Sequence, residues 1–89
     1  MSYSSLYRQI YELKDINSYS KHEQLVTGII NAIDANNLRK GDKLPSINEM
    51  VSELRYARKT IVKAYEELID RGIVESKKLK GYFVVSEET

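Results

Sequence analysis

Basic side chains gather in two short stretches of this 89-residue chain. The first stretch contains no acidic residue, and its bases are Arg55, Arg58, Lys59 and Lys63. The second stretch holds the lysines Lys77, Lys78 and Lys80. Lys and Arg side chains grouped in this way can neutralise phosphates along a polyanion. Because the net charge of the whole chain is only +1, the clusters predict a local footprint for a nucleic acid.

Hydrophobic spacing predicts that the first cluster opens a helix over 58–70. The residues expected to face inward are Ile61, Val62, Tyr65, Leu68 and Ile69. The acids of this segment come late, at Glu66, Glu67 and Asp70. A helix with a packed inner face and a cationic leading end fits the major groove of a DNA duplex, which is about 12 Å wide. We therefore predict that this helix contacts double-stranded DNA.

Three further helices are predicted upstream of this one. The first spans Tyr3 to Lys14, with an apolar repeat at Leu6, Ile10 and Leu13 beside a stripe of Tyr3, Tyr7 and Tyr11. The other two begin at Ser-x-x-Glu capping boxes that start at Ser20 and Ser46. The earlier of these two helices is expected to run to about Ala35, and the later one to end before a break at 55–57.

The C-terminal part of the chain predicts a β-hairpin. Two β-type runs at 73–75 and 82–85 flank a basic, turn-like segment at 76–81. Gly72 is suited to end the preceding helix in the left-handed conformation. The expected fold is mainly α with a small β-hairpin: a winged helix-turn-helix with a three-helix core plus wing, preceded by one extra N-terminal helix. We assign 1–18 to the accessory helix and its loop, and 19–86 to the winged helix-turn-helix domain.

The residue inventory argues against several other classes of protein. The chain has no cysteine and one histidine, so a structural metal site has little support. It contains no phosphate-binding loop and no nucleophile beside an orienting base, and we expect neither an enzyme nor a cofactor. No apolar run approaches the roughly 18 residues of a membrane span, and a cytoplasmic location is expected.

Several strings in register resemble one known family. They are Gly41-Asp42-Lys43-Leu44-Pro45-Ser46, Glu49, Arg58, Thr60-Ile61, Gly72-Ile73-Val74 and Lys80-Gly81-Tyr82-Phe83-Val84. Over about residues 20–85 the chain resembles the DNA-binding domain of GntR-family regulators. The resemblance implies a bacterial transcriptional regulator, expected to be a repressor, that binds a pseudo-palindromic double-stranded operator as a homodimer. It also implies a small-molecule effector bound by a C-terminal domain that is absent from this chain.

The resemblance and the placement of polar and basic side chains together assign DNA-binding roles to particular residues. The start of the third core helix, at Arg58, Lys59 and Thr60, is expected to read the operator, with Lys63 on the same outer face. Asn48 adds a contact from the second core helix. Lys78 and Lys80 lie on the wing, where Gly81 allows the backbone to approach a sugar-phosphate strand or the minor groove. Ser46 is expected to cap its helix, and it can also donate to a phosphate.

The chain departs from the family pattern at Asn48 and in the turn at 55–57. The family usually has arginine where this chain has Asn48, which predicts a weaker contact or a different base preference. The turn usually reads Gly-Val-Ser, and here it is Arg55-Tyr56-Ala57. Ala57 has no side chain that could cap the following helix, a loss of roughly 1 kcal/mol. Arg55 must either adopt a left-handed conformation or reshape the turn.

Alternatives remain open for several features. The whole domain could be a winged helix that binds a partner protein through its tyrosines. The first helix could cover the core of its own domain, or its tyrosine stripe could form a dimer contact. The lysines of 77–80 could protect a strand edge as well as contact DNA.

Overall fold

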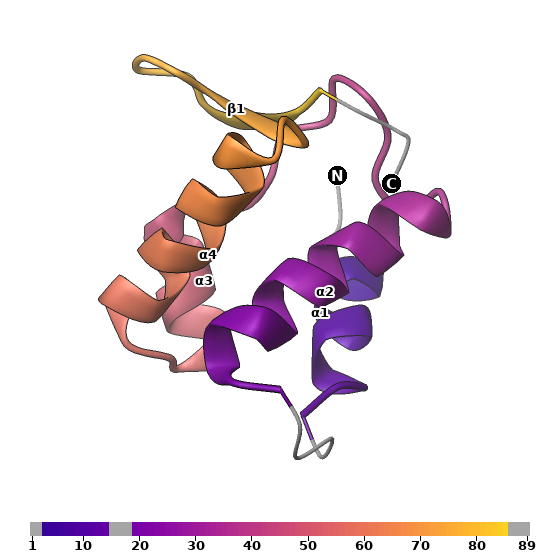
Figure 1. The fold of residues 1–89 in the computed structure, drawn as a ribbon, viewed down its shortest axis with the longest axis vertical. Helices are drawn as coiled ribbons and strands as arrows, with labels where there is room; N and C mark the ends of the chain where they lie inside the picture. The colour runs from indigo at the N-terminus through magenta and orange to yellow at the C-terminus, as the bar shows by residue number, and fades with distance from the viewer. Residues whose placement is uncertain (1–2, 15–18, 86–89) are drawn as a thin grey trace.

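Four helices and one antiparallel hairpin make up the part of the chain that the computed structural model describes, residues 3–14 and 19–85 (Figure 1). The helices are α1 (Ser4–Tyr11), α2 (Lys21–Asp34), α3 (Ile47–Leu54) and α4 (Arg58–Asp70). The strands are β1 (Val74–Lys77) and β2 (Gly81–Val84). This order confirms the predicted fold class. The predicted loop at 15–18 and the domain end at residue 86 lie outside the described residues.

Both predicted capping boxes form. The Ser20 hydroxyl accepts from the Glu23 amide at 3.3 Å, and the Glu23 carboxylate accepts from the Ser20 amide at 2.9 Å. The corresponding distances for Ser46 and Glu49 are 3.0 and 2.9 Å. Hydrogen bonds from the serine amide and hydroxyl lower the pKa of both glutamates. Each helix therefore begins with a fixed negative charge, which the helix dipole favours.

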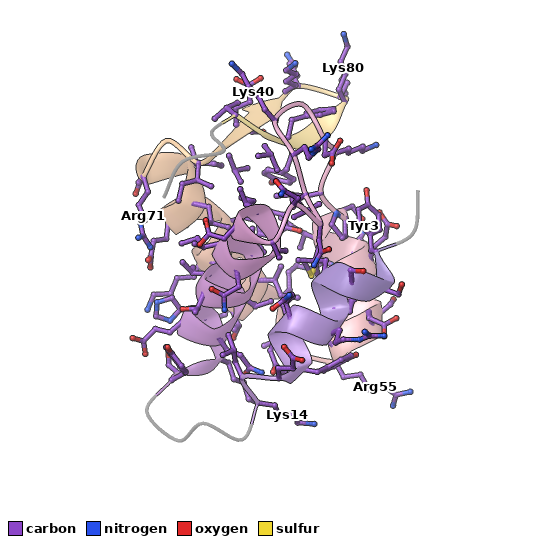
Figure 2. All side chains as sticks on the ribbon, turned by 90° about the vertical axis from the view of Figure 1, so that its right-hand side faces the viewer. Tyr3, Lys14, Lys40, Arg55, Arg71 and Lys80 are labelled. Carbon is purple, nitrogen blue, oxygen red and sulfur yellow. The ribbon has the colours of Figure 1, made fainter. Side chains whose placement is uncertain are left out.

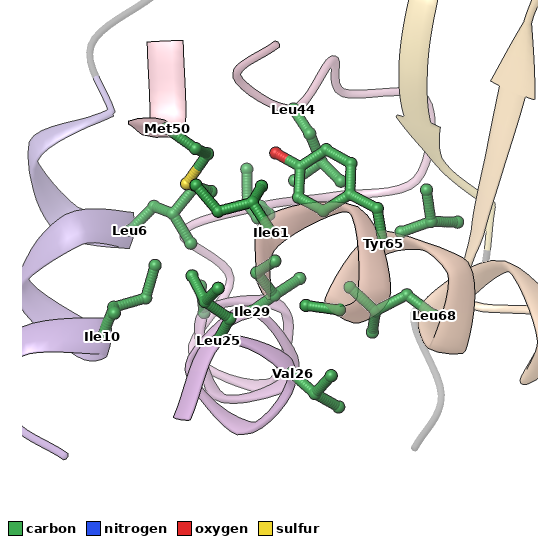
Figure 3. Packing of buried hydrophobic residues seen from close by; sticks show 14 of the residues in the cluster. Leu6, Ile10, Leu25, Val26, Ile29, Leu44, Met50, Ile61, Tyr65 and Leu68 are labelled. Atoms are coloured by element: carbon green, nitrogen blue, oxygen red, sulfur yellow. The ribbon is translucent and has the colours of Figure 1, made fainter. Parts of the chain in front are cut away.

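The core lies where α4 packs against α2 and α3 (Figure 3). Ile61, Tyr65 and Leu68 of α4 are each at most 1% exposed. Val62 and Ile69 are only half-buried, although the sequence predicted them to face inward. They lie about 100° around the helix from Ile61 and Leu68, which takes them to the edge of the buried face.

The element ends differ from the prediction by a few residues. The first helix ends at Tyr11, and the Leu13 amide donates to the Ile10 carbonyl at 3.1 Å in a tighter turn. The hairpin turn is shorter than expected, because Lys77 pairs with Gly81 and only 78–80 remain as a loop. The Lys80 amide closes that loop on the Lys77 carbonyl at 2.9 Å. The strands are therefore 74–77 and 81–84 rather than 73–75 and 82–85.

The extra helix α1 covers the core of its own domain. Leu6 and Ile10 are 1% and 0% exposed, and α1 lies along α2. At the crossing, Gly28 of α2 leaves room for Ile10. The buried Gln24 side chain donates to the Ile10 carbonyl at 2.9 Å and accepts from the Tyr56 hydroxyl at 2.7 Å. These contacts confirm the core-covering interpretation of α1.

Gly28→Ala is expected to lower stability by about 1–3 kcal/mol, the usual effect of overpacking a filled core. A Cβ at this position would lie 2.6 Å from Ile10 Cγ1 and 3.0 Å from Ile10 Cα, so backbone would have to move. Helix propensity alone predicts the opposite sign, a gain of up to about 1 kcal/mol. Urea denaturation followed by circular dichroism measures whether Gly28→Ala lowers or raises the free energy of unfolding. Ile10→Ala, which removes the nearest atom, should reduce the added cost of Gly28→Ala. A stabilised Gly28→Ala single variant would contradict the close contact between Gly28 and Ile10.

Candidate nucleic-acid interface

The first turn of α4 is cationic and has no side-chain cap. Arg58, Lys59 and Lys63 are exposed, and Thr60 is half-buried. Ala57 makes no side-chain hydrogen bond to the helix, and the first turn contains no acid. The positive end of the helix dipole therefore has no capping side chain and lies beside two basic side chains. This combination attracts an anion, and phosphate groups bind readily at such helix starts.

Another helix contributes to this cationic surface. Lys59, Thr60 and Lys63 line a shallow hollow of about 260 Å³ together with Ser20, Lys21 and His22 at the start of α2. Lys21 stands over the Tyr56 ring, with its ammonium 5.3 Å from the ring centroid. Lys21 is not among the residues predicted from the sequence, because only the packing of α2 on α4 brings it beside the basic cluster.

The turn between α3 and α4 settles the two alternatives for Arg55. Arg55 adopts the left-handed conformation, with φ 59° and ψ 30°, and is exposed. The left-handed region costs a non-glycine residue roughly 1–2 kcal/mol. The turn is therefore not reshaped, and the conformational strain lies in the backbone of Arg55. Tyr56 anchors the turn, since its ring is buried and its hydroxyl donates to Gln24.

The wing presents two exposed lysines and an exposed leucine. Lys78 and Lys80 are exposed on either side of Leu79, which is 98% exposed and left-handed with φ 64°. Lys77 is engaged within the hairpin, because its ammonium lies 3.3 Å from Glu75 and 4.9 Å from the centre of the Phe83 ring. Leu79 is not among the predicted site residues, although an apolar residue between two lysines in a turn is itself an unusual signal.

Gly81 makes room for a further lysine. Its φ is +120°, and a Cβ there would lie 2.9 Å from Lys43 Cε. Lys43 also forms an isolated bridge with Phe83, so the loop before α3 joins the wing. The space beside Gly81 is therefore occupied by Lys43 of the same chain, which adds another base near the wing. Figure 2 shows Lys40, from the same loop, at the same end of the molecule as Lys80.

The predicted site residues fall into separate groups. Lys59, Thr60 and Lys63 meet at the start of α4, while Lys78 and Lys80 share the wing. The first turn of α4 and the hairpin tip both lie toward the left of Figure 1, the first below the middle of the view and the second near its top. Two positions stand apart: Ser46 caps α3, and Asn48 is exposed in a groove between α3 and α1.

One buried tyrosine connects these elements. The Tyr65 hydroxyl of α4 donates to the Pro45 carbonyl, just before α3, at 2.6 Å. Its ring meets Tyr82 of the wing edge-on, with ring centres 4.8 Å apart and planes at 78°. Burial raises the pKa of Tyr65 well above its usual value, so the phenol keeps its proton for this hydrogen bond.

These observations define a winged helix-turn-helix DNA-binding domain: α3 and α4 form the helix-turn-helix, and the hairpin on α4 is its wing. The family model described as "Bacterial regulatory proteins, gntR family" matches residues 21–84. The chain therefore belongs to the GntR family of bacterial regulatory proteins.

Curated relatives carry names that agree with this family. The chain is 34% identical over 62 residues to the HTH-type transcriptional regulator Rv1152 of Mycobacterium tuberculosis, covering 70% of this chain and 51% of that protein. It is 38% identical over 50 residues to YhcF of Bacillus subtilis, an uncharacterized HTH-type transcriptional regulator, covering 56% of this chain and 41% of that protein. Across the curated relatives it matches, the chain spans between 14% and 51% of their length.

Solved structures show the same arrangement. YtrA from Sulfolobus acidocaldarius, a GntR-family transcription factor, matches with a TM-score of 0.72 and 39% identity over 78% of this chain and 72% of that chain. A GntR-family transcriptional regulator from Listeria monocytogenes matches with a TM-score of 0.73 and 29% identity, covering 81% and 62%. Among residues 3–14 and 19–85, no helix has both the length and the apolar character needed to cross a lipid bilayer.

Tyr65→Phe is expected to destabilise the domain by about 1–3 kcal/mol, because the Pro45 carbonyl loses a buried donor. For a domain of this size the melting temperature should fall by roughly 4–8 °C for each kcal/mol. Thermal unfolding followed by circular dichroism measures the change. Tyr19→Phe, at a tyrosine that is 37% exposed, is the matched control and should leave the melting temperature nearly unchanged. Equal stabilities for the two variants would show that the Tyr65 hydroxyl contributes nothing.

Proposed function

We propose that the chain is the operator-reading domain of a bacterial transcriptional regulator, a repressor that acts in the cytoplasm. The helix α4 enters the major groove of double-stranded DNA, and the wing contacts the flanking backbone or minor groove. The observation that carries this proposal is the first turn of α4, which has exposed bases, no acid and no capping side chain. Phosphate oxygens would complete the hydrogen bonding of that helix start.

Individual residues take distinct roles in this proposal. Arg58, Lys59 and Thr60 reach base edges from the leading end of α4. Lys63 contacts phosphate and is joined by Lys21, because the two lysines border the same hollow. Lys78 and Lys80 hold the flank from the wing, and the exposed Leu79 between them offers an apolar contact to sugar edges.

The second helix of the motif contributes at its start. The Ser46 hydroxyl caps α3 by accepting from the Glu49 amide, and its single proton, which also bonds to the Glu49 carboxylate, would be donated to a phosphate in place of that carboxylate. Asn48 follows two residues later and is exposed. An asparagine carries no charge, so its contact adds hydrogen bonding without the electrostatic attraction that an arginine would bring.

The proposed assembly on DNA is a homodimer on a pseudo-palindromic operator. Two copies would place their α4 helices in successive major grooves, about 34 Å apart along the duplex. The curated relatives are longer than the matched region, which leaves room in such regulators for a further domain that would bind a small-molecule effector.

Arg58→Ala is expected to cost about 1–3 kcal/mol at one base pair of the operator and to relax specificity there. The operator is first obtained by selection from random DNA. Fluorescence anisotropy then compares that sequence with its single-base variants. Arg71→Ala is the matched control, because it removes the same side chain from the opposite end of the same helix. Unchanged operator affinity in Arg58→Ala would remove this residue from the reading surface.

Lys80→Ala is expected to weaken binding to every sequence by a similar factor. Loss of one phosphate contact should make the slope of log K against log salt shallower by about 0.9. Titrations at several salt concentrations, on operator and on random duplex, measure both effects. Lys14→Ala is the control, since Lys14 lies at the opposite end of the molecule from Lys80 (Figure 2). A loss confined to the operator, with the salt slope unchanged, would contradict a phosphate role.

A further inference from the structure

A groove of about 1010 Å³ separates α1 from α3. Three tyrosines of α1 line it, namely Tyr3, Tyr7 and Tyr11, opposite Glu49 and Glu53 of α3. The volume is at the upper end of the range for small-molecule sites, which is about 300–1,000 Å³. The family-matched region begins at residue 21, so the α1 wall of the groove lies outside it.

Tyrosine hydroxyls span the groove toward α3 and the loop before it. The Tyr11 hydroxyl donates to a Glu53 carboxylate oxygen at 3.0 Å and lies 3.2 Å from the Glu53 carbonyl. The Tyr3 hydroxyl donates to the Lys43 carbonyl at 2.7 Å. Tyr7 lies one helical turn from each, half-buried in the wall between them. These contacts position an aromatic surface along the groove.

The charge of the groove is negative. Glu49, Glu53 and Glu12 line it, against a single guanidinium from Arg8. Burial, followed by the carboxylates of Glu53 and Glu49, raises the pKa of Tyr7 to about 12. Glu49 is held in its ionised form by the capping hydrogen bonds from Ser46. A phosphate or carboxylate ligand would therefore be repelled, whereas a cation would be attracted.

We propose that the groove binds an organic cation with an apolar, aromatic body, such as a quaternary phosphonium or ammonium compound. The positive charge would lie against the tyrosine faces, with Glu49 and Glu53 nearby, and the apolar body would fill the groove. Aromatic rings attract cations through their negative faces, and recognition of quaternary ammonium groups commonly uses such rings. This inference goes beyond the proposed function; the groove shares Asn48 with the proposed operator contacts, and the tyrosines and glutamates that carry the inference are not among those contacts.

Two ions of the same shape and opposite charge provide the test. Tetraphenylphosphonium and tetraphenylborate are each titrated into the 89-residue chain by isothermal titration calorimetry. Tetraphenylphosphonium should bind saturably with one site per chain, and tetraphenylborate should bind at least about tenfold more weakly. Amide chemical shifts should change on α1 and α3 and remain constant on the wing.

Variants then locate the binding site. Glu53→Gln can still accept the Tyr11 hydrogen bond, and it should weaken tetraphenylphosphonium binding up to about fivefold, as for an exposed ion pair. Tyr7→Leu should weaken it about fivefold through loss of the ring face. Glu66→Gln is the matched control, because Glu66 is exposed on α4 and does not line the groove. Circular dichroism establishes that each variant is folded.

Four outcomes would overturn the proposal. The first is equal binding of the two ions, which would indicate apolar adsorption alone. The second is no saturable binding of tetraphenylphosphonium. The third is equal weakening by Glu66→Gln and Glu53→Gln. The fourth is a change of oligomeric state in Glu53→Gln by sedimentation, which would show that a second copy of the chain occupies the groove.

Discussion

Tyr65 holds together the elements that face DNA in the proposed complex. Its ring is buried on the inner side of α4, its hydroxyl binds the carbonyl that precedes α3, and its edge meets Tyr82 of the wing. The angle between the reading helix and the wing therefore cannot change without opening a close-packed interior. Exposed residues such as Arg58 and Lys80 can be substituted without disturbing this packing. In the proposed complex, the choice of operator can therefore change while the fold stays the same.

The three helices that follow α1 begin in two different ways. Ser20 with Glu23, and Ser46 with Glu49, supply an acceptor and a negative charge to the starts of α2 and α3. The start of α4 has Ala57 instead, followed by bases that the helix dipole disfavours. A bound phosphate would provide what serine and glutamate provide in the other two helices. The stability that α4 lacks because Ala57 cannot cap it is the physical reason for proposing that the first turn of α4 binds DNA.

Local patterns predicted the helices and their caps, because a Ser-x-x-Glu box or an apolar repeat is complete within one segment. Residues brought to the interface by packing were missed, as Lys21 and Lys43 illustrate. The predicted strand ends were wrong because residues with high β propensity extend beyond the paired strands at both ends of 73–85. The register depends instead on the three-residue turn at 78–80. The groove beside α1 was also beyond prediction, since no periodicity encodes the distance between two helices.

The buried side chain of Gln24 connects α1 to the turn between α3 and α4. Its amide holds the last turn of α1 through the Ile10 carbonyl and, on its other side, receives the hydroxyl of Tyr56. Tyr56 stands two residues before α4, so docking of α1 and order in the helix-turn-helix corner share one buried amide. A coupling free energy between the two through this amide would be reciprocal: a variant that strengthens α1 docking by that route would stabilise the α3–α4 turn by the same amount. Through Gln24, the N-terminal helix α1 is therefore connected to the turn that precedes α4.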